Sequence, residues 1–320
     1  MFIPAHDAVV FYALEPLGDI EESNDGTTPA TFKTTSSSLT RHLLGYTNLP
    51  QTARGLNNSK GFALGLQGAA YNKRGRVEPT ATVEIRPGSL DALDALLPDA
   101  NGVLPYIALF VAVKGQYTDV YRYCKPTTLD WKFGGGGDKG GGEISISAAL
   151  WGTAYERIAP LPIPTSDLRA LGTPLMWHDV REFTITSAPN GTPVSYRKAL
   201  MSLSVKVDYG LERKNERPYW GDNHLLSRTS YALLEHHLNV SGEIGLHARL
   251  PEDLFSAVAD ANAQDWGDIV INCTNIGNDG FKLKLAGAFP SDETLGGGES
   301  SAEIDHTVSF TANTITVTTQ

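Results

Sequence analysis

The residues whose spacing first suggests chemistry lie in the glycine-rich run FGGGGDKGGGE at 133–143. Three of its glycines, beginning at Gly135, have the G-x-G-x-x-G spacing of a turn that binds a dinucleotide between a strand and a helix. The next residues, ISISAAL at 144–150, alternate as a strand does. Lys139 is followed by glycine, where a phosphate-binding loop has Ser or Thr. We therefore interpret the run as a flexible turn and expect no cofactor there.

The histidines and cysteines form no pattern of metal ligands. His236 and His237 are adjacent, so on a strand they would point to opposite sides. Cys124 and Cys273 lie in unrelated contexts, YRYCKP and VINCTN, and predict two free thiols within strands. The sequence also has no G-x-S-x-G elbow and no recognisable cysteine nucleophile. We predict no catalytic residues, no metal site and no cofactor.

Two glutamates are more informative because they occupy matching places in an internal repeat. TATVEIRPGSLDALDALLPDAN at 80–101 parallels VSGEIGLHARLPEDLFSAVADAN at 240–262, and Glu84 aligns with Glu243. Each segment has the pattern of a strand, a break and a short amphipathic helix. Strand alternation points both carboxylates away from the core. A shared use explains this, and ordinary exposed positions kept after a duplication explain it equally well.

The repeat continues on both sides of these segments. Downstream, matching strands are followed by a glycine-rich turn in both copies, at 108–113 and 268–273, 120–125 and 281–286, and GGGE at 140–143 and 296–299. Upstream, 62–76 takes the place of 201–217. The loop that follows is short in the first copy and expands to roughly 214–236 in the second, by this alignment.

The strand pattern at 201–209 predicts one buried face and one solvent-exposed face. Alternation buries Met201, Leu203, Val205, Val207 and Tyr209, and it leaves Asp208 and the other polar residues outward. The predicted fold is mainly β, a β-sandwich or barrel with one short flanking helix per unit, in two tandem copies. The predicted parts are an N-terminal arm at 1–60, a first β domain at 61–164 and a second at 165–320, with the boundary in the proline-rich segment 158–174.

The composition of the 320 residues excludes several classes of function. A net charge of −10 argues against a basic groove that holds nucleic acid through its phosphates. Hydrophobic residues make up 41% and charged residues 19%, and no apolar run approaches the roughly 18 residues that a membrane span needs. The N-terminus has no secretory signal pattern. We expect a soluble globular protein without membrane insertion.

The order of these elements, with GEIGLHARLPEDLF at 242–255 and the terminal strand HTVSFTANTITVTT at 306–319, resembles the tail tube proteins of long-tailed bacteriophages. The resemblance covers most of 60–160 and 175–320. It implies a structural virion protein and no enzyme, in a tail made in the host cytoplasm. Its subunits would close into six-fold rings around a β-barrel and stack into a hollow tube for DNA. A duplicated subunit would fill two ring positions, so three chains would complete a ring.

The resemblance also implies roles for particular residues. Glu84, Glu243 and Asp208 would line an acidic lumen, through which DNA passes without specific binding because its phosphates are repelled. The loop at 214–236 and the N-terminal arm would contact the next ring, with contact residues Arg217, Tyr219, Trp220 and His224. The implied partners are further copies of this chain and the tape-measure, tail terminator and tail-tip proteins.

Two other functions compete with this one. A two-domain β-sandwich that binds carbohydrate or a cell-surface ligand would need exposed aromatic residues clustered on one face. The tryptophans are instead dispersed along the chain, at Trp131, Trp151, Trp177, Trp220 and Trp266. A hydrolase with an unrecognised site is supported only by the general abundance of acidic residues and histidines.

Overall fold

A computed structural model gives the fold of the chain. It describes residues 8–16, 20–21, 31–47, 50–53, 59–62, 69–73, 78–86, 91–99, 102–134, 142–162, 173–186, 191–214, 232–235, 237–247, 266–275, 280–296 and 305–319. Within these residues, no helix is long and apolar enough to cross a membrane.

The described chain is mainly β. Its strands, in chain order, are β1 Ala8–Leu14, β2 Ile20–Glu21, β3 Thr31–Phe32, β4 His42–Leu43, β5 Tyr46–Thr47, β6 Gln51–Ala53, β7 Ser59–Phe62, β8 Ala69–Lys73, β9 Thr80–Arg86, β10 Ile107–Val113, β11 Tyr117–Phe133, β12 Ser145–Trp151, β13 Ala154–Ile158, β14 Val180–Thr186, β15 Pro193–Ser195, β16 Leu200–Asp208, β17 Leu211–Lys214, β18 Ala232–Glu235, β19 Asn239–His247, β20 Gly267–Thr274, β21 Gly280–Gly296, β22 Asp305–Ala312 and β23 Thr314–Thr319. The helical segments are α1 Asp91–Asp94 and the 3-10 turns η2 Ser36–Ser38 and η3 Trp177–Asp179.

The first half of the chain forms two layers of antiparallel strands. One layer contains β1, β10, the first part of β11 and β13. The other contains β5, β6, β9, β12 and the second part of β11. The 17-residue strand β11 therefore passes from one layer into the other. Apolar side chains of both layers, such as Val83, Leu109 and Ile146, pack in one core between them.

The second half has the same set of pairings. Its outer layer contains β14, β20, the first part of β21 and β23. Its other layer contains β16, β19, β22 and the second part of β21. The long strands β11 and β21 even have a β-bulge at the same place, between Pro126 and Thr128 and between Pro290 and Asp292. A bulge tolerates a proline because it interrupts the hydrogen-bond ladder.

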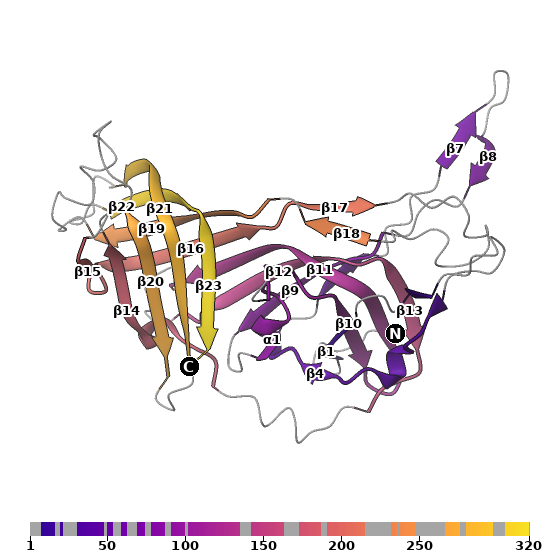
Figure 1. Ribbon diagram of the computed structural model, residues 1–320. Helices are drawn as coiled ribbons and strands as arrows, with labels where there is room; N and C mark the ends of the chain where they lie inside the picture. The colour runs from indigo at the N-terminus through magenta and orange to yellow at the C-terminus, as the bar shows by residue number, and fades with distance from the viewer. Residues whose placement is uncertain are drawn as a thin grey trace.

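The two halves meet through direct strand pairing. β11 pairs with β16 from Thr128 opposite Asp208 to Phe133 opposite Leu203. This contact, which we call the internal seam, joins the second layers of both halves into one sheet. The order in this shared sheet is β6, β9, β12, β11, β16, β19, β22 and β21. Figure 1 shows the two halves side by side with β11 and β16 running between them.

Alternating burial in β16 confirms most of the predicted face. Leu203, Val205, Val207 and Tyr209 are buried, whereas Met201 is half-buried. The register shifts between Leu200 and Ser202, and this bulge turns Leu200 into the core in place of Met201. Both cysteines are free and buried, Cys124 in β11 and Cys273 in β20, as predicted.

Several sequence expectations need correction. Within 1–60, β1 pairs with β10 along its whole length and β6 extends the shared sheet, so these two strands belong to the body of the first half and not to an arm. The place of β16 is taken in the first half by β5 and β6, and not by 62–76, since both pair with β9 as β16 pairs with β19.

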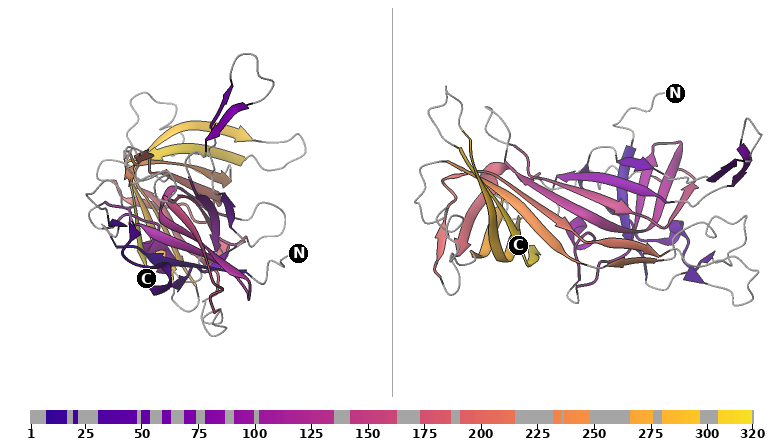
Figure 2. Two further views of the ribbon diagram at one scale, coloured as in Figure 1. Left: turned by 90° about the vertical axis from the view of Figure 1, so that its right-hand side faces the viewer. Right: turned by 90° about the horizontal axis from the view of Figure 1, so that it is seen from above.

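The first half also has a long hairpin of its own. β7 and β8 pair with each other and project beyond the body (Figures 1 and 2). Of the predicted first helix, the described residues contain the turn α1, which buries Leu93, and Leu96 just after it is buried as well. The second predicted helix and the boundary near 165 lie outside the described residues.

Candidate functional site

The polar face of the shared sheet is the candidate functional surface. One cross-strand row runs from Glu84 through Ser147 and Asp130 to Lys206 and Ser241. Residues directly opposite each other on antiparallel strands lie about 5 Å apart. Glu84 of the first half therefore lies in the same row as residues of the second half.

Two further rows place the other predicted residues on this face. Lys132, Ser204, Glu243 and Ser309 form the second row. The third contains Thr128, Asp208 and Asn239. Ser204, Lys206 and Asp208 alternate along β16, so the three rows lie on one side of the sheet. The structure thus brings Glu84, Glu243 and Asp208 onto one continuous surface.

This face is mixed in charge, with an excess of carboxylates. Asp130 and Asp292 add two acids, and Lys132 and Lys206 add two ammonium groups. A shallow groove crosses the face between β11 and β22. Such a surface hydrates well and offers phosphates little net attraction.

The register of the pairings corrects the match between the two glutamates. Val83 lies opposite Ala148 on β12, and Ile244 lies opposite Val308 on β22. Within the two sets of pairings, Glu243 therefore corresponds to Thr82 and not to Glu84. The error of two residues keeps the side chain on the same face, because strand side chains alternate with a period of two.

The internal seam has a second part, formed by the hairpin of β17 and β18. The Leu104 amide donates to the Glu235 carboxylate at 3.3 Å, and Glu235 also forms an ion pair with Lys125. The Tyr106 hydroxyl and the Leu233 backbone amide lie 3.2 Å apart, with the amide as donor. The Lys125 ammonium lies 4.3 Å from the Tyr106 ring. The hairpin of the second half thus covers a polar and aromatic spot on the first half.

The corner of the first half contains a buried ion cluster. The Arg122 guanidinium bonds to Glu15 and Glu156, and the second oxygen of Glu15 accepts the Tyr123 amide. Burial alone would lower the pKa of Arg122, but the two carboxylates outweigh it and raise that pKa. The cluster is fully paired, which favours a structural role for it.

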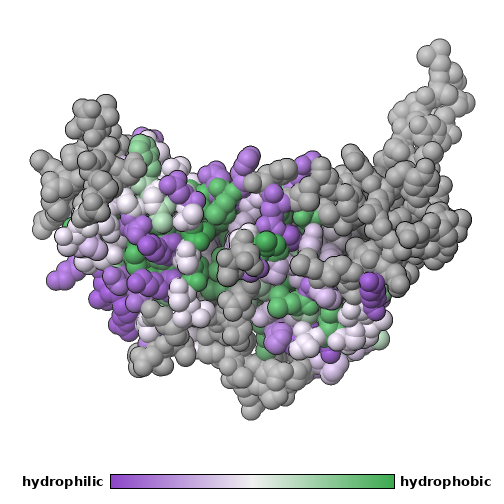
Figure 3. All heavy atoms as spheres, viewed as in Figure 1, coloured by the Kyte–Doolittle hydropathy of each residue, from purple (hydrophilic) through white to green (hydrophobic). Residues whose placement is uncertain are grey.

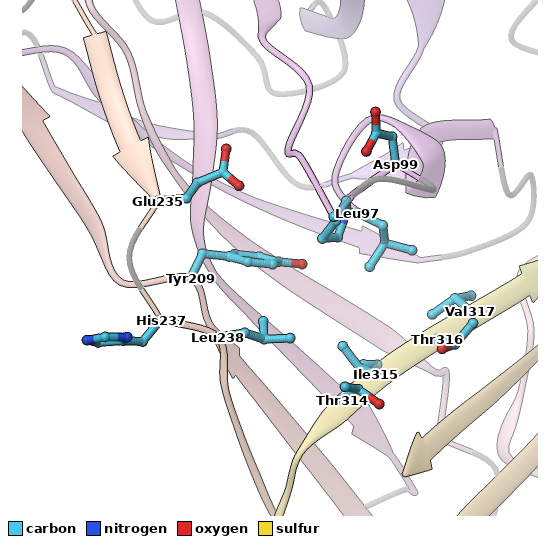
Figure 4. A pocket seen from close by; sticks show the side chains of 12 residues that line it. Leu97, Asp99, Tyr209, Glu235, His237, Leu238, Thr314, Ile315, Thr316 and Val317 are labelled. Atoms are coloured by element: carbon cyan, nitrogen blue, oxygen red, sulfur yellow. The ribbon is translucent and has the colours of Figure 1, made fainter.

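A pocket lies between the two halves, beside the seam (Figure 4). Apolar side chains, among them Leu97, Leu238 and Val317, share it with Tyr209 and Glu235. Figure 3 shows hydrophobic residues reaching the surface in this central region. Burial raises the pKa of the Tyr209 hydroxyl, which donates to the Leu96 carbonyl at 3.3 Å, so it stays protonated and structural.

Other chemistry finds little support in the described part of the chain. There, no three histidine, cysteine or acidic side chains come together as a metal site. Burial raises the pKa of the Cys273 thiol, with a smaller contribution from Asp179, and so suppresses its nucleophilic form. Trp131 and Trp266 are buried, and Trp151 and Trp177 are partly buried, so the described tryptophans form no exposed aromatic platform.

The residues predicted to contact the next ring, Arg217, Tyr219, Trp220 and His224, lie outside the described residues. So does the central part of the glycine-rich run, 135–141. The segment after that run is the strand β12, as the alternation at 144–150 predicted. The sequence pattern does not predict the internal seam; Pro126 and Pro290 are a sequence signal only for the bulges in the β11–β12 and β21–β22 pairings.

Comparison with protein-family models gave no match, and comparison with curated proteins gave none either.

Proposed function

We propose that this chain is a structural protein that assembles into rings, as the subunit of a bacteriophage tail tube does. Its two halves are copies of one unit, and its shared sheet lines the central channel. The copies are supported by the matching pairings, the bulges at Pro126 and Pro290, and the equal hydrogen bonds from Thr153 to Arg122 and from Asn313 to Ala286, both 3.0 Å.

The observation that carries this proposal is the internal seam. There, the edge strand β11 of the first unit pairs with the edge strand β16 of the second unit. In the second half, β21 corresponds to β11, and in the first half, β6 corresponds to β16. Among the described strands, β6 pairs only with β9, and the second part of β21 pairs only with β22. A unit that joins head to tail and keeps both ends open repeats until the rotation closes a ring.

Ring closure also removes a physical liability. Unpaired strand edges are templates for uncontrolled association, and a closed barrel has none. Six units, supplied by three chains, would make a ring in which each unit contributes four strands of the shared sheet. Stacked rings would then form the tube, with Arg217, Tyr219, Trp220 and His224 proposed as contacts between rings and with tape-measure, terminator and tail-tip proteins as further partners.

The polar face of the shared sheet fits the wall of such a channel. Glu84, Glu243 and Asp208 lie on it together, so a closed ring would repeat these carboxylates around the lumen. A wall with excess negative charge keeps phosphates hydrated and unbound, which suits the passage of DNA. The opposite face contributes to the hydrophobic core.

The assembly is tested by microscopy and by mass. We expect negative-stain images of the concentrated protein to show rings or hollow tubes, and mass photometry to show a species of three times 34.4 kDa. A protein that remains monomeric at all concentrations, and in the presence of tail-tip proteins, would exclude the proposal.

The channel wall is tested by reversing its charge. Glu84→Lys combined with Glu243→Lys should make assembled rings bind short duplex DNA in a salt-dependent way, measured by fluorescence anisotropy. Glu182→Lys combined with Asp268→Lys changes the net charge equally on the outer layer, at β14 and β20, and should have little effect. Equal DNA binding by both variants would argue against this wall.

A further inference from the structure

The internal seam shows how one unit holds the next, and it combines strand pairing with a covering hairpin. β16 pairs with β11, and the hairpin that follows β16 lies over Leu104, Tyr106 and Lys125 of the first half. Lys125 is only 4% exposed as a result. Strand and hairpin are consecutive in the chain, so both parts of the grip belong to one unit.

The second half has the same surface without its cover. Lys125 precedes the bulge at Pro126, opposite Trp151, and Phe289 precedes the bulge at Pro290, opposite Thr311. Phe289 therefore holds the place of Lys125. It is 51% exposed. Trp266 corresponds to Tyr106 in the same way, because Gly267 and Ile107 precede matching register shifts. The lysine and tyrosine of the first half thus correspond to the exposed Phe289 and the buried Trp266 of the second half.

The first half has a corresponding hairpin, β7 and β8, which does not lie over the second half (Figure 1). β7 and β8 stand between β6 and β9, as β17 and β18 stand between β16 and β19. The registers also correspond, with Lys60 opposite Asn72 and Arg213 opposite Leu233. Figure 1 shows β17 and β18 lying along the first half, whereas β7 and β8 project from the end that faces away from the second half.

We propose that the second half of one chain binds the first half of another copy through this grip. β21 pairs antiparallel with β6, with Thr294 opposite Ala53, Leu295 opposite Thr52, and Gly296 opposite Gln51. The hairpin of β7 and β8 covers Phe289. The register follows from the internal seam, where the corresponding pairs are Asp130 with Lys206, Trp131 with Val205, and Lys132 with Ser204. This inference rests on the proposed ring and specifies its contact between chains.

The exposed Phe289 supports a second copy of the chain as the binding partner. A half-exposed phenylalanine on a strand beside an open edge costs solubility unless a partner covers it. The polar Lys125 in the corresponding place at the internal seam fits as well. That contact forms within one chain, so it needs no apolar side chain to drive association. A second copy brings both the edge strand and the hairpin, so one partner satisfies both features.

The register is tested by cross-linking between chains. Equal amounts of Ala53→Cys protein and Thr294→Cys protein are mixed under assembly conditions and treated with a short bis-methanethiosulfonate linker. We expect covalent dimers on a non-reducing gel. Asp130→Cys combined with Lys206→Cys provides the same geometry within one chain. Both natural cysteines are buried, so they contribute little background.

A shifted pair makes the result decisive. Ala53→Cys with Asp292→Cys moves one partner by two residues on the same side of β21 and should give little product. If rings form but the shifted pair reacts and the Thr294 pair does not, the proposed register is wrong and the ring stands. If the protein forms no rings at all, the proposed function fails together with the inference.

A substitution of Phe289 tests whether the hairpin of β7 and β8 from another copy covers this residue. Phe289→Ser should raise the protein concentration needed for ring assembly by about 10-fold to 100-fold, because the apolar contact with the neighbouring hairpin is lost. The fold of the single chain should not change, since the side chain is already 51% exposed. Val194→Ser, at an apolar residue 45% exposed on β15, is the matched control. Equal assembly by both variants would overturn the role of Phe289.

Discussion

Tyr123 has a backbone conformation that its residue type disfavours. Its φ is +49°, and the residue at the same place in the second half is Gly287, with φ +60°. A left-handed tyrosine is held by its contacts: its amide donates to Glu15, and its ring stacks on Phe32 with centroids 5.4 Å apart. The same corner is therefore built by glycine in one half and by a supported aromatic residue in the other.

Replacing Gly287 tests this conformation. Gly287→Ala should lower the free energy of unfolding by about 1–3 kcal/mol, because a left-handed backbone is strained by a Cβ atom. That atom would also lie 2.3 Å from Nδ2 of Asn313, which must move. Gly115→Ala imposes similar strain at φ +67° with nothing within 4 Å. We expect a smaller loss there by urea denaturation. An unchanged stability for Gly287→Ala would contradict the left-handed backbone.

Arg122 neutralises a buried carboxylate in the first half. Arg122→Met should destabilise the protein by about 3–5 kcal/mol, because the buried Glu15 carboxylate loses its counter-charge. Both side chains are almost fully buried, at 1% and 0% exposure. Arg157→Met removes the pair with Asp119, whose arginine is 45% exposed, and should cost less than about 1 kcal/mol. Similar losses in both variants, measured by chemical denaturation, would show that the cluster is not tightly coupled.

Among the elements, the hairpin of β17 and β18 contacts the first half through the Glu235 carboxylate as well as through Leu233 and Tyr106. Glu235 accepts the Leu104 amide and pairs with Lys125, which is otherwise closed off from water. Loss of the Glu235 carboxylate leaves the buried Lys125 ammonium without a counter-charge. The hairpin should then open locally while the strand pairing of β11 and β16 persists.

Hydrogen exchange measures that opening. In Glu235→Ala, the amides of Leu104 and of 232–235 should exchange about tenfold faster, because the hydrogen bonds to a charged group are lost. Glu182→Ala on β14 serves as the control, since that strand lies in the outer layer away from the hairpin. Unchanged protection at Leu104 would mean that the hairpin is held by other contacts.

How far the sequence predicts these elements depends on strand length. From Leu203 onward β16 alternates clearly, and its buried face there could be read directly from the sequence, whereas the bulge near Met201 could not. β5 and β6 have two and three residues, too few for a period, so their place was assigned to 62–76 instead. The offset between Glu84 and Glu243 was wrong by two residues for a related reason: a shift of two preserves the pattern, and only the hydrogen-bond register distinguishes it.

For the whole molecule, the proposed ring contains two kinds of contact between units. The contact within a chain buries Lys125 against the partly exposed Glu235, while the contact between chains would bury Phe289. Backbone pairing is common to both. Salt screens exposed charges but affects apolar contacts and backbone hydrogen bonds little.

Salt dependence follows from this difference. Between about 0.1 M and about 0.5 M NaCl, the concentration at which chains assemble should change by less than about threefold, because no ion pair is proposed between chains. Analytical ultracentrifugation measures it. A loss of assembly at the higher salt concentration would indicate that charged side chains, and not Phe289 and the strand edges, hold the chains together.

The internal seam has one more consequence. Since β11 and β16 belong to the same polypeptide, units would enter the proposed ring only in pairs. A ring with one unit missing or one unit too many would leave half a chain outside the circle. The even number of units per chain would therefore limit the sizes that the proposed ring can take. Closure with the wrong number would require a change of two units, and so a much larger change of curvature at each contact.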